Sequence, residues 1–203
     1  MLIVGVTGGI ASGKSLVAKI LKDSGAHLID ADRIVHELLM PDQKAWEEVL
    51  EYFGSGIQSP DGTIDRRKLG ELVFNDPDKR AWLNSCLHPK VFAEYTSQVK
   101  HLCDRTPECI VIFDAALLIE TGYHRKMDMT IVVYANQEQQ LERLMSRNML
   151  TREQALSRIR SQMPLEEKRG HADYVIDNTG SRQETERQAQ ELFVRIKREA
   201  ERT

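Results

Sequence analysis

The sequence has few cysteines among its 203 residues, and none of them lies in a metal-binding or redox pattern. Cys86, Cys103 and Cys109 form no CxxC pair, and their number is odd. This usage argues against a disulfide framework and against a zinc site, and it is typical of a reducing compartment. We therefore expect small, partly buried thiols in a cytoplasmic protein.

Long hydrophobic runs and a strong charge of one sign are also missing. No apolar run approaches the roughly 20 residues that a membrane-spanning helix needs. Residues 1–9 lack a basic region and a cleavage site, so we interpret them as a strand of the mature protein and not as a signal peptide. The net charge is −3, and no basic stripe typical of a nucleic-acid binder is present. The sequence thus predicts neither a membrane nor a nucleic-acid partner.

The first 30 residues show the pattern of a strand, a glycine-rich turn, a helix and a second strand. Residues 2–7 form a short apolar run, which is typical of a strand buried on both faces of a parallel sheet. Residues 14–24 carry apolar side chains on one helical face, and Gly25 ends this helix. Residues 26–30 form the second strand, so the pattern predicts a βαβ unit.

Residues 31 to about 102 show helical patterns and no convincing strand. Short helices are expected at residues 66–75 and 79–87, and His88-Pro89 predicts a break before a longer helix. Such a long helical stretch between sheet strands predicts a substrate-binding insertion. Further strands are expected at residues 109–113, 130–134 and 174–176.

Residues 8–15, GGIASGKS, match the phosphate-binding pattern GxxxxGK[ST] between a buried strand and a helix. Glycines allow close approach of the backbone to phosphates, and the loop amides with the helix N-terminus favour an anion. Lys14 is expected to reach the β- and γ-phosphates of ATP, and Ser15 to ligate Mg²⁺. The residues expected to bind the nucleotide here are Gly9, Ile10, Ala11, Ser12, Gly13, Lys14, Ser15 and Leu16.

Carboxylates follow two of the expected strands. Asp30 and Asp32 follow the second strand, and Asp114 ends the third. Because the carboxyl ends of parallel strands face the ligand crevice, Asp32 is our candidate for orienting and deprotonating an acceptor hydroxyl. Asp30 is equally well explained as a helix cap. Asp114 is expected to hold Mg²⁺ through water, although a strand-terminal turn residue remains the alternative.

An arginine-rich segment near residues 137–160 is a candidate lid, because arginines neutralise the charge that phosphoryl transfer spreads over three oxygens. We expect one or two of its arginines to reach phosphate and the others to be solvated. Arg143 is assigned a catalytic role and Arg147 a nucleotide-binding role. His88 is first a packing residue and second a candidate substrate contact.

Several motifs together resemble the dephospho-CoA kinase family over nearly the whole chain. They are the phosphate loop, Asp30-Ala31-Asp32, Asp61-Gly62-Thr63-Ile64-Asp65-Arg66, His88-Pro89, the segment from Asp114 to Glu120, Arg158 with Gln162, and Asp177-Asn178. The phosphate loop alone is generic, whereas the combination is specific. The chain departs from the family pattern at Ala116, where proline is common, and at Ile119, where phenylalanine is common.

The resemblance implies that ATP and Mg²⁺ are used to phosphorylate the ribose 3′-hydroxyl of dephospho-coenzyme A, the last step of coenzyme A synthesis. It implies that Asp32 is the base at the acceptor hydroxyl and that Asn178 lies near the nucleotide base. The substrate-binding residues that we carry over are Asp32, Arg66, His88, Leu117 and Glu120.

The fold expected is an α/β three-layer P-loop kinase core with a parallel sheet of about five strands, a helical coenzyme A-binding insertion and an arginine-rich lid. The core is assigned to residues 1–32, 108–136 and 171–203, the insertion to 33–107 and the lid to 137–170 of a single domain. The protein is expected to be a monomer or a weak homo-oligomer.

Other functions of a P-loop protein were weighed against this one. A kinase acting on shikimate, gluconate or a nucleoside monophosphate shares the loop, but the helical insertion with its motifs argues against it. A GTPase switch needs an Asn-Lys-x-Asp segment after a late strand, and the sequence has none. A nucleic-acid-dependent ATPase is disfavoured by the mild negative charge.

Overall fold

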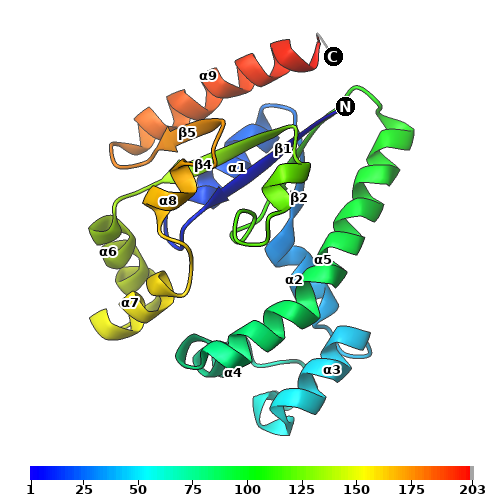
Figure 1. The fold of residues 1–203 in the computed structure, drawn as a ribbon, viewed down its shortest axis with the longest axis vertical. Helices are drawn as coiled ribbons and strands as arrows, with labels where there is room; N and C mark the ends of the chain where they lie inside the picture. Colours follow the sequence, from blue (N-terminus) through cyan, green and yellow to red (C-terminus); the bar gives the residue numbers. More distant parts are fainter. Residues whose placement is uncertain (202–203) are drawn as a thin grey trace. The chain divides into compact units, whose positions relative to one another are not determined.

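Five parallel strands form one sheet in the computed structural model, which describes residues 1–201 (Figure 1). The strand order is β2-β3-β1-β4-β5, so the chain crosses over between neighbours that are not consecutive in sequence. The α/β fold with about five parallel strands is confirmed. The strands are β1 (Leu2–Gly8), β2 (His27–Asp30), β3 (Ile110–Asp114), β4 (Met129–Tyr134) and β5 (Tyr174–Asp177).

The central strand β1 pairs with β3 on one side and with β4 on the other. Val6 lies in register with Asp114, and Gly8 with Val133. The carboxyl ends of these strands therefore meet at one edge of the sheet, which is where a doubly wound fold binds its ligand. Strands β1, β3 and β4 are buried along nearly their whole length, because helices cover both faces.

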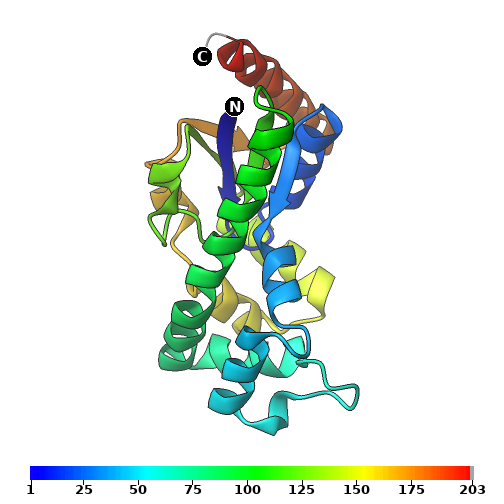
Figure 2. The ribbon, with the colours of Figure 1, turned by 90° about the vertical axis from the view of Figure 1, so that its right-hand side faces the viewer.

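One face of the sheet packs against α1 (Lys14–Asp23) and α9 (Arg182–Ala200), which lie beside each other in Figures 1 and 2. Alternate strand residues such as Val4 and Ile131 are fully buried against this pair, because successive side chains of a strand point to opposite faces. Val17 and Ile196 contribute the matching apolar stripes of the two helices.

The opposite face is covered in part by α8 (Leu165–Arg169) and by the segment after β3. Ile119, Val132 and Leu165 form a small buried cluster there. This segment also contains the short helix η2 (Tyr123–Lys126).

The two helices of the expected lid, α6 (Gln137–Asn148) and α7 (Arg152–Arg160), pack against each other through Leu141, Leu144 and Ala155. Thr151 and Gln154 form a capping box at the start of α7. Ser181 caps α9 by accepting a hydrogen bond from the amide of Glu184.

Residues 31–98 form a second compact unit with its own apolar core, and the other described residues form the first. Its buried side chains include Ala45 and Val49, which come from one helix, and Leu69, which comes from another. The elements that begin in this unit are α2 (Ala31–Leu38), α3 (Lys44–Phe53), η1 (Ser55–Ile57), α4 (Arg66–Asn75) and α5 (Pro77–Arg105).

The Asp61-Gly62 stretch of this unit is a turn followed by a helix cap. Gly62 adopts φ 86°, a conformation that favours glycine, and Ile64 bridges to Gln58 across the turn. Asp65 then accepts hydrogen bonds from the amides of Arg67 and Lys68 and so caps α4. The turn and the helix cap therefore account for most of the motif at residues 61–66 in structural terms.

Helix α5 runs without interruption through Pro89, so the break expected at His88-Pro89 is wrong. A proline removes one helical hydrogen bond and usually kinks or ends a helix. Here Leu87 and Val91 are buried on either side of the proline, whereas Pro89 itself is exposed. Burial of the flanking turns outweighs the local penalty, and the short helix expected at residues 79–87 and the longer helix expected after it belong to one helix of 29 residues. Among residues 1–201, no helix combines the length and the apolar character needed to cross a membrane.

Candidate active site

The phosphate loop has a conformation that its glycines make possible. Gly13 adopts φ 96°, and a Cβ atom at this position would lie 2.0 Å from Nδ2 of Asn178. A Cβ atom at Gly9 would lie 2.5 Å from Nε2 of Gln140. Helix α1 starts directly after Gly13, with no side-chain cap and no acidic residue in its first turn. Such a helix start favours a bound anion.

Asn178, which follows β5, supports the phosphate loop through hydrogen bonds of its side-chain amide. Its Nδ2 donates to the carbonyl oxygen of Ser12 at 2.7 Å, and its Oδ1 accepts from the hydroxyl of Thr185 at 2.7 Å. The side chain is 7% exposed, so both of its polar atoms are used inside the protein. The structure thus gives Asn178 a supporting role in the loop, while its contact with a nucleotide base stays a prediction.

Lys14 and Asp114 form an ion pair at the carboxyl edge of the sheet. The Lys14 side chain is 10% exposed and that of Asp114 is 5% exposed, so the pair is largely desolvated. Asp30 ends β2 in register with Asp114, which places a second carboxylate at this edge. A cation and two acidic strand ends therefore gather beside the phosphate loop, as expected for phosphoryl transfer.

The residues at this edge fit a magnesium ion. Ser15, exposed in the first turn of α1, offers a hydroxyl, and Asp114 offers a carboxylate. Mg²⁺ prefers such oxygen ligands and commonly keeps several waters, so one or two protein ligands suffice. No cluster of three His, Cys, Asp or Glu side chains suited to a metal ion occurs within residues 1–201.

Arg143 of α6 donates through Nη2 to the carbonyl oxygen of Asn178 at 2.9 Å. Its Nη1 is buried and has no hydrogen-bond partner in the described chain. A buried guanidinium donor without an acceptor is costly, so the site fits a ligand that brings one. Arg147, one turn further along α6, is exposed and bonds to Asn148.

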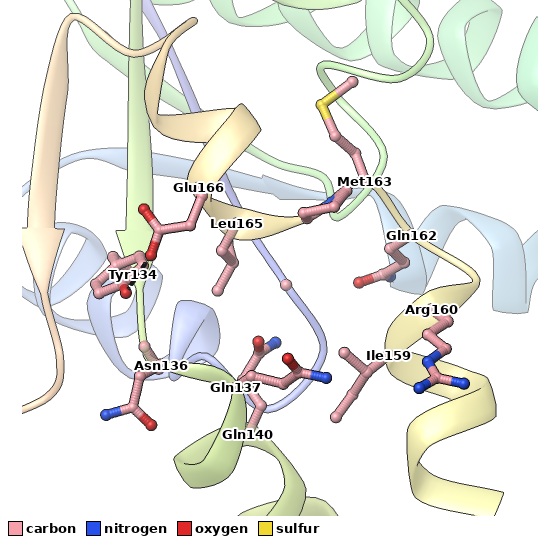
Figure 3. A pocket seen from close by; sticks show the side chains of 13 residues that line it. Tyr134, Asn136, Gln137, Gln140, Ile159, Arg160, Gln162, Met163, Leu165 and Glu166 are labelled. Atoms are coloured by element: carbon pink, nitrogen blue, oxygen red, sulfur yellow. Dashed lines mark hydrogen bonds between the residues drawn. The ribbon is translucent and has the colours of Figure 1, made fainter.

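Two glutamines hold the backbone of Ile10 from opposite sides. The amide of Ile10 donates to Oε1 of Gln162 at 2.8 Å, and its carbonyl oxygen accepts from Nε2 of Gln140 at 2.6 Å. Gln140 lies in the first turn of α6, and Gln162 follows α7. Figure 3 shows both amides beside a cavity of about 400 Å³, which also borders Gly9. We call these two contacts the glutamine clamp.

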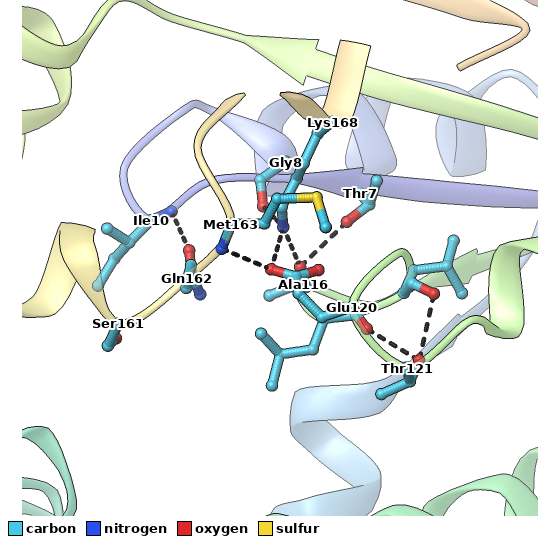
Figure 4. Close-up of polar contacts among 12 residues, drawn as sticks. Thr7, Gly8, Ile10, Ala116, Glu120, Thr121, Ser161, Gln162, Met163 and Lys168 are labelled. Carbon is cyan, nitrogen blue, oxygen red and sulfur yellow. Dashed lines mark hydrogen bonds and ion pairs between the residues drawn. The ribbon is translucent and has the colours of Figure 1, made fainter. Parts of the chain in front are cut away.

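A buried lysine, Lys168 of α8, was not predicted from the sequence. Figure 4 shows its ammonium group among oxygen atoms of Gly8, Ala116 and Glu120. In the sequence it stands among exposed charges in EEKR, and no local pattern distinguishes it from them.

The remaining sequence-predicted residues are distributed over both units. Leu117 and Glu120 follow β3, and Glu120 pairs with Lys168 at 2.9 Å. Asp32 is exposed in the first turn of α2, two positions beyond the end of β2. Arg66 is exposed at the start of α4, and His88 is half-buried in α5.

Comparison with known proteins gives a consistent result. The family model described as dephospho-CoA kinase matches residues 2–184. The dephospho-CoA kinase of Carboxydothermus hydrogenoformans is 48% identical over 186 residues, which cover 92% of this chain and 90% of the relative. The dephospho-CoA kinase structure from Campylobacter jejuni superposes with a TM-score of 0.69 at 31% identity and covers 97% of each chain. A shikimate kinase from Acinetobacter baumannii, with a TM-score of 0.55 and 16% identity over 97% of this chain and 93% of that one, shares the fold alone.

Proposed function

Because the chain belongs to the dephospho-CoA kinase family, we propose that it transfers the γ-phosphate of ATP to the ribose 3′-hydroxyl of dephospho-coenzyme A. The products are coenzyme A and ADP, which makes this the last step of coenzyme A synthesis. The observation that carries the proposal is the pairing of Lys14 with Asp114 beside an uncapped helix start, within a chain that the family model matches over residues 2–184.

Lys14 and the start of α1 bind the phosphates in this proposal. The helix N-terminus and the ammonium both present positive charge where negative charge develops, and little reorganisation is needed during the reaction. A phosphate oxygen competes with Asp114 for Lys14, which leaves the carboxylate available for Mg²⁺ together with Ser15. The bound ion would neutralise charge on the transferring group.

Asp32 is the proposed base at the acceptor hydroxyl. Its support is its position two residues after the end of β2, whose last residue lies in register with Asp114. A carboxylate that hydrogen-bonds to the acceptor hydroxyl both orients it and takes its proton. Arg143, whose Nη1 is buried without a partner, is the proposed lid arginine for a phosphate oxygen, and Arg147 is proposed to assist nucleotide binding from the exposed side of α6.

The helical unit is proposed to bind the rest of dephospho-coenzyme A, with Arg66 and His88 as contacts. Leu117 and Glu120 are proposed to complete the substrate site from the segment after β3. We further propose a cytoplasmic enzyme, which is supported by three cysteines that are all free thiols. We also propose that it acts as a monomer or a weak homo-oligomer.

The test is an ADP-release assay with ATP and Mg²⁺ against dephospho-coenzyme A, shikimate, gluconate, AMP and water. Turnover with dephospho-coenzyme A alone, with the new phosphate assigned to the 3′-position by phosphorus NMR, is the expected result. Turnover with one of the other acceptors would preserve the kinase activity but reject the substrate. ADP release with water alone would reject the kinase activity itself.

A further inference from the structure

Among residues 1–201, the charged group buried most completely is the ammonium of Lys168, whose side chain is 0% exposed. A buried charge is tolerated when it is paired and hydrogen-bonded, and an ammonium has three protons to donate. Lys168 has three acceptors: the carbonyl oxygen of Ala116 at 2.7 Å, a carboxylate oxygen of Glu120 at 2.9 Å and the carbonyl oxygen of Gly8 at 3.3 Å. Its hydrogen-bonding capacity is therefore fully used.

Two of these acceptors belong to the segments that carry the phosphate-handling residues. Gly8 is the last residue of β1 and leads into the phosphate loop, and Ala116 lies two residues after Asp114. The hydroxyl of Thr7 donates to the same oxygen of Ala116 at 3.1 Å. The distance between the start of the loop and the segment after β3 is therefore set by donors that converge on this one oxygen.

The third acceptor extends this arrangement to the segment that follows α7, within the residues assigned to the lid. The oxygen of Glu120 that pairs with Lys168 also accepts from the amide of Met163 at 3.1 Å. Figure 4 shows this carboxylate between the lysine and the chain at Met163. The phosphate loop, the segment after Asp114 and the end of the lid are thus joined through a single ion pair.

The buried ammonium is also close enough to the phosphate site to be influenced by it. Burial lowers the pKa of Lys168, and the Glu120 carboxylate opposes this effect. The positive charge of Lys14 lowers the pKa of Lys168 further. The two ammonium groups therefore interact, although Lys168 has no exposed surface with which to touch a substrate.

We infer that Lys168, held by Glu120, is a positioning residue for phosphoryl transfer. Its ammonium fixes the end of β1 against the segment after Asp114, so that Lys14 and Asp114 keep the geometry that the reaction needs. This inference rests on the proposed kinase function. A displacement of about 1 Å at such a site is enough to cost a large factor in rate, even when it originates in a residue far from the chemistry.

A purely structural ion pair and a positioning residue make different predictions for a double variant. Replacing a buried ion pair by uncharged residues of similar volume is often neutral for stability. Lys168→Met with Glu120→Gln removes both charges and keeps an acceptor for the amide of Met163. If the ion pair is purely structural, the double variant should regain the stability and the activity that the single variant Lys168→Met loses. If Lys168 is a positioning residue, the double variant should regain the stability but not the activity.

The experiment measures kcat, both KM values and the melting temperature of the wild type, Lys168→Met and the double variant. We expect the double variant to stay folded with kcat lowered about 10- to 100-fold and with the KM for ATP nearly unchanged. Arg169→Met, which removes an exposed cation from the same helix, is the matched control and should retain wild-type kcat. A double variant whose kcat is within about threefold of wild type overturns the inference.

Thr7→Val provides a second measurement should the double variant not fold. It removes one donor to the oxygen of Ala116 without changing any charge. A several-fold lower kcat with an unchanged melting temperature supports the positioning role, and an unchanged kcat contradicts it. Wild-type turnover in the same assay separates these outcomes from a failure of the proposed function. A wild type that is inactive with every acceptor would reject the kinase reaction, and the positioning role would be rejected with it.

Discussion

At the scale of single residues, the site depends on how each polar group is paired. Lys14 and Asp114 hold each other in a largely desolvated place, and Asn178 uses both ends of its amide inside the protein. Arg143 retains one buried donor that has no hydrogen-bond partner among the residues that the structure describes. Substitutions at these positions change function through the partner that is left behind as well as through the lost group.

Asp32→Asn tests the proposed base. The amide keeps the size of the side chain but cannot accept the proton, so we expect kcat to fall about 100-fold or more, while ATP binding is unchanged. Steady-state kinetics and calorimetry with ATP measure the two quantities. Glu37→Gln, on the same helix and exposed, is the control and should behave as wild type. An unchanged kcat for Asp32→Asn would remove Asp32 from the reaction.

His124 makes a pH-dependent contribution to stability. Its pKa is lowered from 6.5, mainly by burial and also by electrostatic interaction with His171 and Arg125. Because the folded state disfavours the protonated ring, the unfolded chain binds more protons just below pH 6.5, so stability falls as the pH drops. The loss begins near pH 6.5 and is complete below the lowered folded pKa.

Urea unfolding between pH 7.5 and 5 measures this effect. His124→Gln should lose less stability over that range than the wild type, because it carries no titrating ring. Equal slopes for the two proteins would show that other groups dominate the acid sensitivity.

At the scale of elements, local signals predicted the parts of the site that are consecutive in sequence. The phosphate loop and the strands around it were predicted because each is specified within a few residues. The continuity of α5 was missed because the local rule for Pro89 is overridden by burial of neighbouring turns. Tertiary packing routinely outweighs a single unfavourable position.

Pro89→Ala tests the cost of that position. The alanine restores a helical hydrogen bond and relieves the ring clash, which is offset in part by greater freedom of the unfolded chain. We expect the free energy of unfolding to rise by about 1–2 kcal/mol. Chemical denaturation measures it, with Ser85→Ala of the same helix as a control. A decrease would mean that the packing of Leu87 and Val91 depends on the shape that the proline gives to the helix.

At the scale of the whole molecule, the sequence did not predict the contacts between residues that are far apart in the chain. Lys168 bonds to Gly8, 160 positions away in sequence, and the fold alone brings the two together. The glutamine clamp on Ile10 also joins residues more than a hundred positions apart. The family resemblance pointed to Glu120 and Gln162, but their partners became clear only from the three-dimensional structure.

Nucleotide binding is expected to stabilise the whole first unit. A ligand at 100 times its Kd adds about 2.7 kcal/mol to the free energy of unfolding. We therefore expect ATP with Mg²⁺ to raise the melting temperature of the wild type by about 5–10 °C. Lys14→Met should show a much smaller rise, whereas Lys19→Met, an exposed change on the same helix, should show the full one. An equal shift in Lys14→Met would mean that Lys14 does not bind the nucleotide.

The glutamine clamp also determines where the helix pair α6–α7 can bend. Both ends of the pair are fastened to one residue, because Gln140 and Gln162 grip the carbonyl and the amide of Ile10. Because both ends of the helix pair are hydrogen-bonded to the same residue, a movement of the pair at this end would also displace Ile10. We therefore expect any bending of the pair to occur at the turn between α6 and α7, where Met149 is 90% exposed and adopts φ 52°. We expect such bending near Met149 to leave the conformation of the phosphate loop unchanged.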